Sequence, residues 1–351
     1  MPILPLYSLS PQRFDNAVIL KRLNAASRQL AELKGVATTI PNQRILINTL
    51  VLQEAKDSSE IENIVTTHDE LFRSTNEMFV SPAAKEVARY RQALWTGFEL
   101  VRDTRLLTNN HIELIQEKLE CNSAGFRKTL GTELRDMAGR TVYIPPSPDK
   151  LQGLMRDLER FINDDTLFYA DTLIKMALIH HQFESIHPFY DGNGRSGRIL
   201  NVLYLVKEGL LDIPVLYLSR YIVRNKSDYY RLLQSVRDND TWEDWVLYML
   251  TAVEETARES VMTIQAIKTL LQETKQQIRK QFRFYSQDLI NNLFTHPYTK
   301  IEFVMRDLSV SRITATTYLD KLTMGGFLQK QKVGRSNYYV NLPLLQILSA
   351  I

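Results

Sequence analysis

The chain has 351 residues, of which 44% are hydrophobic and 24% are charged. This composition is typical of a globular protein with a large core, and the length allows two or three domains. The single cysteine, Cys121, excludes an internal disulfide framework and fits a reducing compartment. The chain shows neither a secretion leader nor an apolar run of membrane-spanning length, so we expect a cytoplasmic protein without membrane contact.

The net charge of +3 is unevenly distributed along the chain. Residues 275–341 contain eleven Lys/Arg and four Asp/Glu, which is a local charge of +7. The rest of the chain therefore carries about −4. Any affinity for nucleic acid is expected only at the C-terminal end.

Helical patterns fill the chain before residue 170. Helices are expected over 16–33 (ended by Gly35), from Gln43 to about Glu62, over 81–104 starting at Ser81, over 108–120 starting at Thr108, and over 148–163. We assign residues 1–104 to an N-terminal helical region. Within it, Ser58 and Glu62 are four residues apart and share one helix face, where Glu62 on composition alone is a solvated carboxylate.

The chemistry of the chain is concentrated in Ile186-His-Pro-Phe-Tyr-Asp-Gly-Asn-Gly-Arg-Ser-Gly-Arg198. An apolar helix over 169–186 precedes this stretch and stops at Pro188, and a buried helix begins near Gly194. A helix N-terminus presents unpaired N–H groups and a partial positive charge, and glycines let the backbone approach an anion closely. The stretch is therefore expected to form an anion-binding turn between two helices.

Four side chains of this turn add to that chemistry. Arg195 and Arg198 can each bind phosphate oxygens with two N–H groups. Asp191 suits Mg²⁺, which prefers one or two carboxylates together with substrate phosphates. His187 can take a proton near neutral pH. The pattern predicts a cradle for nucleotide phosphates with a base beside it.

The stretch resembles the signature of the Fic family, His-x-Phe-x-Asp/Glu-Gly-Asn-Gly-Arg-x-x-Arg, at every specified position. Members of that family mostly move AMP from ATP to a Ser, Thr or Tyr hydroxyl of a protein. The resemblance implies a mainly α, Fic-type helical bundle and an adenylyltransferase that uses Mg²⁺ and takes ATP as substrate. His187 would be the general base, Asp191 the magnesium ligand, and Phe189 a packing residue. The ATP-binding residues would be Gly192, Asn193, Gly194, Arg195, Ser196, Gly197 and Arg198, with Asn225 and Tyr230 at the adenine and ribose pocket.

The segment Ser58-x-x-x-Glu62-Asn63 is similar to the inhibitory motif that many Fic proteins carry. The resemblance implies an inhibitory helix over about 43–64, in which Glu62 pairs with Arg198 and Ser58 belongs to the same motif. An arginine held by a carboxylate cannot clamp the γ-phosphate, so ATP would bind unproductively.

Residues 138–146 break the helical pattern, and Thr141–Ile144 is a short β-favouring run that predicts a small hairpin. One interpretation is a structural connector. The resemblance implies instead a flap, about 139–146, whose free edge pairs with the segment of the target protein that is modified.

Neighbouring His180 and His181 point to different faces of their helix, so we interpret them as core residues and not as metal ligands. The amphipathic stretch Trp242–Gln281 is expected to form two closing helices, which ends a Fic domain over 105–281.

Residues 282–351 form a separate unit that resembles a winged helix. Helices are expected over 288–295, 300–307 and 310–322, and strands over 327–332 and 336–340. If this unit binds DNA, Arg312, Thr314 and Thr317 would face the bases, and Lys330, Lys332 and Arg335 the backbone. The alternative is a protein-interaction module or a homodimer contact, and +7 does not decide between them.

Two other functions stay open at this point. Some proteins with the Fic fold remove AMP or transfer other phosphate-containing groups, and Glu62 could orient a water molecule for such a reaction. A DNA-binding regulator that only senses ATP is the third reading, although it would not need His187.

Overall fold

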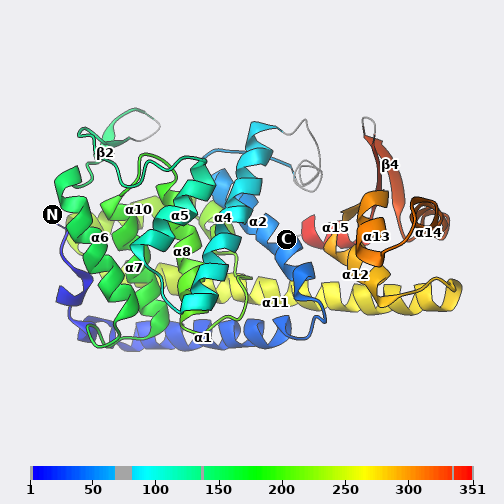
Figure 1. Cartoon of the computed structure of the whole chain (residues 1–351). Helices are drawn as coiled ribbons and strands as arrows, with labels where there is room; N and C mark the ends of the chain where they lie inside the picture. The colour runs from blue at the N-terminus through cyan, green and yellow to red at the C-terminus, as the bar shows by residue number, and fades with distance from the viewer. Residues whose placement is uncertain (1–2, 68–80, 136–137, 334–335, 350–351) are drawn as a thin grey trace.

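The computed structural model describes residues 3–67, 81–135, 138–333 and 336–349 (Figure 1). Over these ranges the chain is mainly helical, with two small antiparallel sheets, as the sequence predicts. None of the helices described is both long and apolar enough to cross a membrane.

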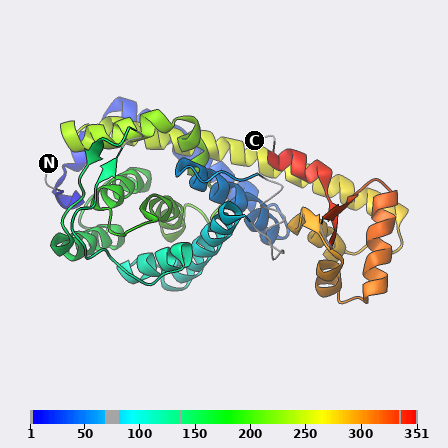
Figure 2. The same cartoon turned by 90° about the horizontal axis from the view of Figure 1, so that it is seen from above.

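Two long helices lie side by side along the base of the molecule, as Figures 1 and 2 both show: α1 (Ala17–Ala37) and α11 (Trp242–Gln281). The Asn16 side chain caps α1 by accepting from two backbone N–H groups. The prediction that Gly35 ends this helix is wrong, because α1 continues to the buried Ala37. A helical glycine costs about 1 kcal/mol relative to alanine, and packing of the last turn outweighs that cost.

The prediction of two closing helices is also wrong, because Trp242–Gln281 forms the single 40-residue helix α11. The segment contains neither glycine nor proline, so nothing in its backbone interrupts the helix. Its buried residues extend from Trp242 through Ala257 to Ile278. The first half closes the helical bundle and the second half carries the C-terminal unit.

The other helices of the bundle surround α8 (Asn193–Lys207), whose side chains are buried from Arg195 to Val206. They are α2 (Gln43–Ile61), α4 (Pro82–Thr104), α5 (Asn109–Glu120), α6 (Pro148–Asn163), α7 (Thr172–Ile186), α9 (Leu218–Arg224) and α10 (Lys226–Asn239), with 3-10 turns at Leu6–Ser8 and Pro11–Phe14. Ser81 and Thr108 cap α4 and α5 as predicted. The predicted hairpin is present as β1 (Leu134–Arg135) paired with β2 (Thr141–Tyr143).

The C-terminal unit has the three helices and the hairpin that the sequence predicts. These are α12 (Gln287–Thr295), α13 (Ile301–Leu308), α14 (Arg312–Met324), β4 (Gln329–Val333) and β5 (Ser336–Val340). Two short elements were not predicted, β3 (Tyr298–Thr299) and α15 (Leu342–Ser349). The β3 strand extends the sheet, whose strand order is β3-β5-β4. The α15 helix brings the unit back to the bundle, where the Gln53 amide of α2 donates to the Leu348 carbonyl.

The basic residues assigned to DNA contact are partly neutralised within the unit. Arg312 pairs with Glu302 at 3.0 Å, and Lys330 pairs with Asp320 at 2.9 Å. Arg335 lies outside the described residues. Whether the unit binds DNA or protein stays a prediction, as do the boundaries between the three predicted domains.

Candidate active site

The predicted turn between two helices is present and begins at His187. This residue ends α7 in the left-handed conformation, at φ 49°. Its carbonyl accepts a hydrogen bond of 2.9 Å from Arg127 Nε, and the next carbonyl, of Pro188, accepts from the Arg127 backbone N–H. Arg127 therefore fixes the backbone of the turn from outside the signature.

The imidazole of His187 is half-buried, and its Nδ1 has no hydrogen-bond partner among the described residues. Burial, followed by the charges of Arg127 and Arg237, lowers the pKa of His187 to about 4. At neutral pH the ring is therefore uncharged and has a lone pair that can take a proton.

The middle of the turn is held by Phe189 and Asn193. The Phe189 ring is buried and packs against Phe126 and Phe183, which confirms its predicted position as a packing residue. The Asn193 amide accepts from the Phe189 N–H and donates to the Phe189 carbonyl, both at 2.9 Å. The side chain predicted to contact phosphates is thus already used to shape the loop, and its role toward ATP stays a prediction.

The first turn of α8 follows, with its N–H groups at the mouth of the site. Gly192 caps the helix with φ 78°, a conformation that favours glycine. At Gly194 a β-carbon would overlap the carboxylate of Glu62. Glu62 therefore lies directly against the N-terminus of α8, where an anion is electrostatically favoured.

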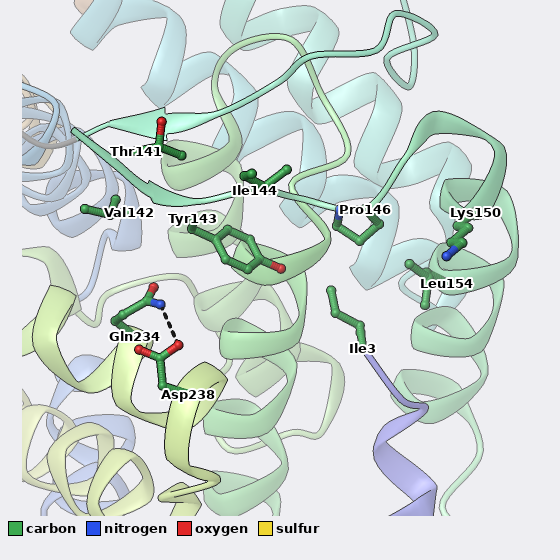
Figure 3. Close-up of a pocket in the computed structure, with 10 residues that line it drawn as sticks. All are labelled: Ile3, Thr141, Val142, Tyr143, Ile144, Pro146, Lys150, Leu154, Gln234 and Asp238. Carbon is green, nitrogen blue, oxygen red and sulfur yellow. Dashed lines mark hydrogen bonds between the residues drawn. The ribbon is translucent and has the colours of Figure 1, made fainter. Parts of the chain in front are cut away.

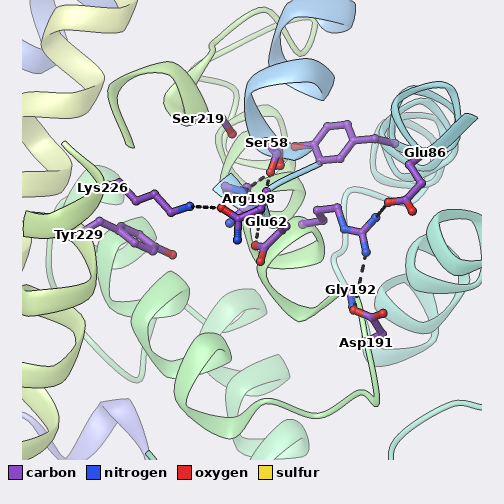
Figure 4. A network of polar contacts seen from close by, with 12 residues as sticks. Ser58, Glu62, Glu86, Asp191, Gly192, Arg198, Ser219, Lys226 and Tyr229 are labelled. Atoms are coloured by element: carbon purple, nitrogen blue, oxygen red, sulfur yellow. Dashed lines mark hydrogen bonds and ion pairs between the residues drawn. The ribbon is translucent and has the colours of Figure 1, made fainter. Parts of the chain in front are cut away.

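Arg198 is the most constrained charged group of the site (Figure 4). Its side chain is 1% exposed and donates to Ser58 Oγ at 2.8 Å, to the Ser58 carbonyl at 2.9 Å and to Glu62 Oε1 at 2.8 Å. Burial would raise the pKa of Glu62, but the charge and hydrogen bond of Arg198 outweigh burial and lower that pKa. The sequence prediction brings together the right residues: Ser58, Glu62 and Arg198 are in contact.

Arg195 is held by acids that the sequence analysis did not identify. Its guanidinium pairs with Glu86 of α4 at 2.7 Å and with Glu120 of α5 at 2.8 Å, and Asp191 lies 3.7 Å away. These acids are far from the signature in sequence and carry no local pattern, so only the packing of α4 and α5 against α8 reveals them. These acids orient Arg195, but they also compete with any phosphate that Arg195 would bind.

A buried hydrogen-bond network behind Ser58 was also missed. Glu54, one turn earlier on α2, accepts from Tyr90 Oη at 3.1 Å, from the Ser219 N–H at 3.2 Å and from Ser219 Oγ. Burial raises the pKa of Glu54 to about 8. The network joins α2 to α4 and α9, so the helix that carries Glu62 is fixed on two sides.

The paired histidines are core residues, as predicted. His180 Nε2 meets Tyr229 Oη at 2.8 Å and His180 Nδ1 meets the Asn201 amide at 3.1 Å, while His181 Nε2 meets the Leu233 carbonyl at 3.1 Å. Within the described ranges no group of three His, Cys, Asp or Glu side chains is arranged to hold a metal ion.

The two candidates on the α9–α10 side differ in position. The Asn225 amide donates to the Tyr221 carbonyl at 2.9 Å, so it serves the junction of the two helices. Tyr230 is 46% exposed, and burial together with the charge of Glu62 raises the pKa of its phenol. Lys226, which the sequence did not single out, donates to the Asn63 side chain at 3.1 Å and so reaches the end of the segment that is predicted to be inhibitory.

A groove of about 520 Å³ runs beneath the hairpin (Figure 3). Val142 and Tyr143 of β2 form one wall, and Gln234 and Asp238 of α10 form the other. The Tyr143 ring is anchored by its hydroxyl, which donates to the Ser185 carbonyl at 2.8 Å. The hairpin is thus tied to the residue two positions before His187, which places the groove next to the signature turn.

Comparison with known proteins matches three successive parts of the chain to descriptions of Fic proteins. The description "Fic/DOC family N-terminal" matches residues 20–99, "Fic/DOC family" matches 103–205, and "Protein adenylyltransferase SoFic-like, C-terminal domain" matches 270–344. A probable protein adenylyltransferase of Aquifex aeolicus is 33% identical over 50% of this chain and 54% of its own length. The protein adenylyltransferase fic-1 of Caenorhabditis elegans is 31% identical over 36% of this chain and 25% of its own. The chain thus spans about half or less of the curated relatives it matches.

Solved structures share the fold at low identity. A Fic family protein from Desulfovibrio desulfuricans superposes with a TM-score of 0.60 at 21% identity, over 95% of this chain and 98% of that one. Fic-1 from C. elegans superposes with a TM-score of 0.55 at 20% identity, over 70% and 72%. With the signature loop, the N-terminal region and the bundle all matched, the chain belongs to the Fic family.

Proposed function

We propose that this protein transfers AMP from Mg-ATP to Ser, Thr or Tyr hydroxyls of target proteins and of itself, and that Glu62 restrains the reaction by holding Arg198. The observation that carries the proposal is the contact of Arg198 with Glu62 and Ser58 beside an intact signature loop. A carboxylate at the N-terminus of α8 occupies the place that suits a phosphate.

In the proposed reaction the target hydroxyl attacks the α-phosphate in line with the leaving pyrophosphate. Backbone N–H groups of residues 192–194 and the N-terminus of α8 stabilise the charge that develops on the phosphates. Arg195 and Arg198 orient the outer phosphates. The uncharged imidazole of His187 takes the hydroxyl proton, because its lowered pKa leaves the ring unprotonated at pH 7.

Asp191 is the residue that fits a magnesium ion. Its side chain is 78% exposed at the mouth of the site, and one carboxylate oxygen accepts from the Gly192 N–H at 2.7 Å, which fixes its orientation. A single carboxylate together with substrate phosphates is the ligand set that Mg²⁺ prefers. The ion would neutralise phosphate charge when bound.

The target segment is proposed to lie along the hairpin, about residues 139–146. In the described part of the chain β2 pairs only with β1, so its other edge can accept a strand. Val142 and Ile144 are 46% and 67% exposed, which gives such a strand apolar contacts. Backbone pairing holds a peptide without reading its side chains, so the groove below the hairpin has to supply any selectivity.

Mass spectrometry of the purified protein after incubation with Mg-ATP tests the proposal. The wild type, Glu62→Gly, and Glu62→Gly combined with His187→Ala are compared. An added AMP that increases in Glu62→Gly and is absent from the double variant is expected. If no variant gains AMP although calorimetry detects ATP binding, self-modification is excluded and the result favours AMP removal or ATP sensing over transfer.

Removal of AMP from a modified protein is the second candidate, and the position of Glu62 favours it. The Glu62 side chain is 35% exposed, and its charge reaches His187, whose pKa it raises against the larger effect of burial. A carboxylate in that place could orient a water molecule toward a phosphodiester. Release of AMP from a pre-modified protein by the wild type, but not by Glu62→Gly, would favour this reaction over transfer.

A further inference from the structure

A second cavity lies away from the signature loop, between the first half of α2 and the middle of α4. Its volume is about 610 Å³, within the range of small-molecule sites. Ile47 and Val51 of α2 and the half-buried Trp95 of α4 form its apolar walls. Figures 1 and 2 show α2 and α4 side by side in the centre of the molecule.

The charged residues that line this cavity are all basic. Arg44 comes from α2, Arg89 and Arg91 come from α4, and no Asp or Glu of the described ranges lines the cavity. None of the three arginines forms an ion pair with any residue of the described ranges, whereas Lys56 and Arg102 on the same two helices do. Three arginines thus line one cavity without an ion pair, and the carboxylate that interacts electrostatically with one of them, Glu120 with Arg89, does not line the cavity.

Arg91 is the arginine whose burial has the clearest energetic effect. Its side chain is half-buried, and burial alone lowers its pKa, with no carboxylate acting in the opposite direction. A desolvated guanidinium is costly unless an anion compensates it. The fork of an arginine matches carboxylate and phosphate oxygens, and an aromatic ring such as Trp95 offers a surface for stacking.

We propose that this cavity is a binding site for a small organic anion, with a phosphate or carboxylate group held by Arg44, Arg89 and Arg91 and an aromatic or aliphatic body packed on Trp95. Both parts are needed, because the arginines recognise only the charge and the apolar wall only the body. The site is separate from the residues of the signature turn and does not rest on the proposed adenylyl transfer.

Phenyl phosphate is the probe for this site, titrated into the full-length protein while tryptophan fluorescence is recorded. Trp242 and Trp245 are 7% and 0% exposed, so a solute that enters the cavity acts mainly on Trp95. Inorganic phosphate, which lacks the ring, and benzyl alcohol, which lacks the charge, are titrated in parallel. Arg91→Met and Arg44→Met remove one guanidinium each, and Arg102→Met on α4 is the control outside the cavity.

Saturable quenching by phenyl phosphate is expected, weakened about tenfold or more in Arg91→Met and Arg44→Met and unchanged in Arg102→Met. Inorganic phosphate and benzyl alcohol should each bind more weakly than phenyl phosphate. Equal affinity of wild type and both cavity variants would overturn the proposal, as would the absence of saturation up to about 10 mM phenyl phosphate. Circular dichroism of Arg91→Met separates a lost site from a lost fold, and the exposed Arg44 gives a variant that leaves the core untouched.

Discussion

Replacing Glu62 by glycine is expected to release Arg198 and increase the rate of AMP incorporation. In the structure Arg198 donates a hydrogen bond of 2.8 Å from Nη2 to Glu62 Oε1 and one of 2.8 Å from Nε to Ser58 Oγ. The substitution removes the carboxylate but leaves Ser58, so Arg198 stays ordered while the space at the N-terminus of α8 is vacated. ATP can then place its outer phosphates where the carboxylate of Glu62 lies now.

The size of the effect follows from the one contact that is lost. A hydrogen bond to a charged group contributes about 1.5–3 kcal/mol, and the lower part of this range suits Glu62 because its side chain is 35% exposed. ATP has to displace this contact before it binds productively. With tenfold for every 1.4 kcal/mol, the lower half of that range, about 1.5–2.2 kcal/mol, should raise transfer at subsaturating ATP about 10- to 40-fold.

Glu60 provides a matched control on the same helix. Its carboxylate is also 35% exposed and pairs with a cation, Lys56, at 3.1 Å, but it does not contact Arg198. Glu60→Gly therefore removes the same charge and places a glycine in the last turn of α2, two residues before the C-cap Glu62. The initial rate of AMP incorporation is measured for both variants and the wild type at several ATP concentrations.

Two results would refute this reasoning. If Glu60→Gly activates as strongly as Glu62→Gly, loosening of α2 and not the freed Arg198 causes the increase. If Glu62→Gly tightens ATP binding in calorimetry without any change in rate, Glu62 competes with ATP but does not control the productive pose.

Three further outcomes follow from buried groups of the bundle. The pKa of His187 is lowered to about 4, so kcat/KM of Glu62→Gly, which reports the free enzyme, should stay level from pH 8 down to about pH 5. A decline with a midpoint near the ordinary histidine pKa of about 6.5 would contradict the burial of that ring. The folded-state pKa of Glu54 is raised to about 8, so its contribution to stability is fully present below a pH of about 4.5 and is lost as pH rises through the folded-state pKa. In urea unfolding, the free energy of unfolding of the wild type relative to Glu54→Gln should fall by about 3 kcal/mol between pH 4.5 and 7. Phe189→Ala should lower the free energy of unfolding by about 3–5 kcal/mol in the same assay, whereas Tyr190→Ala, at a residue that is 50% exposed, should cost far less.

Most helices of the bundle could be predicted because their caps and apolar spacing are visible within a short stretch of sequence. Caps such as Ser81 and Thr108 mark helix starts, and the unbroken apolar run of α8 predicts its burial. The single helix α11 was missed because an amphipathic pattern of 40 residues is longer than most globular helices, so a division in two was the expected case. The helices that pack on it, among them α1, α7 and α15, are not visible in its own sequence.

The site shows the same division between local and long-range information. The signature turn, and the pairing of Glu62 with Arg198, could be predicted because each depends on a recognisable short motif. The acids on Arg195 and the network around Glu54 could not, since Glu86, Glu120 and Tyr90 meet the site only through helix packing. The Asn193 amide illustrates a further limit: residue type indicated a phosphate contact, whereas the fold uses the group to close the loop.

The proposed inhibition and the proposed ATP binding depend on the same physical features of this site. Glu62 is an anion that sits at the N-terminus of α8 and accepts a hydrogen bond from Arg198, which is what a phosphate of ATP would do. A change in Arg198 therefore weakens the inhibitor and the substrate together and cannot separate them. Only changes on α2 act on one partner alone, and this helix is held by Ser58, by Glu54 and, through Gln53, by the C-terminal unit. If Glu62 inhibits as proposed, a physiological signal that activates this protein would have to move α2 and leave α8 in place.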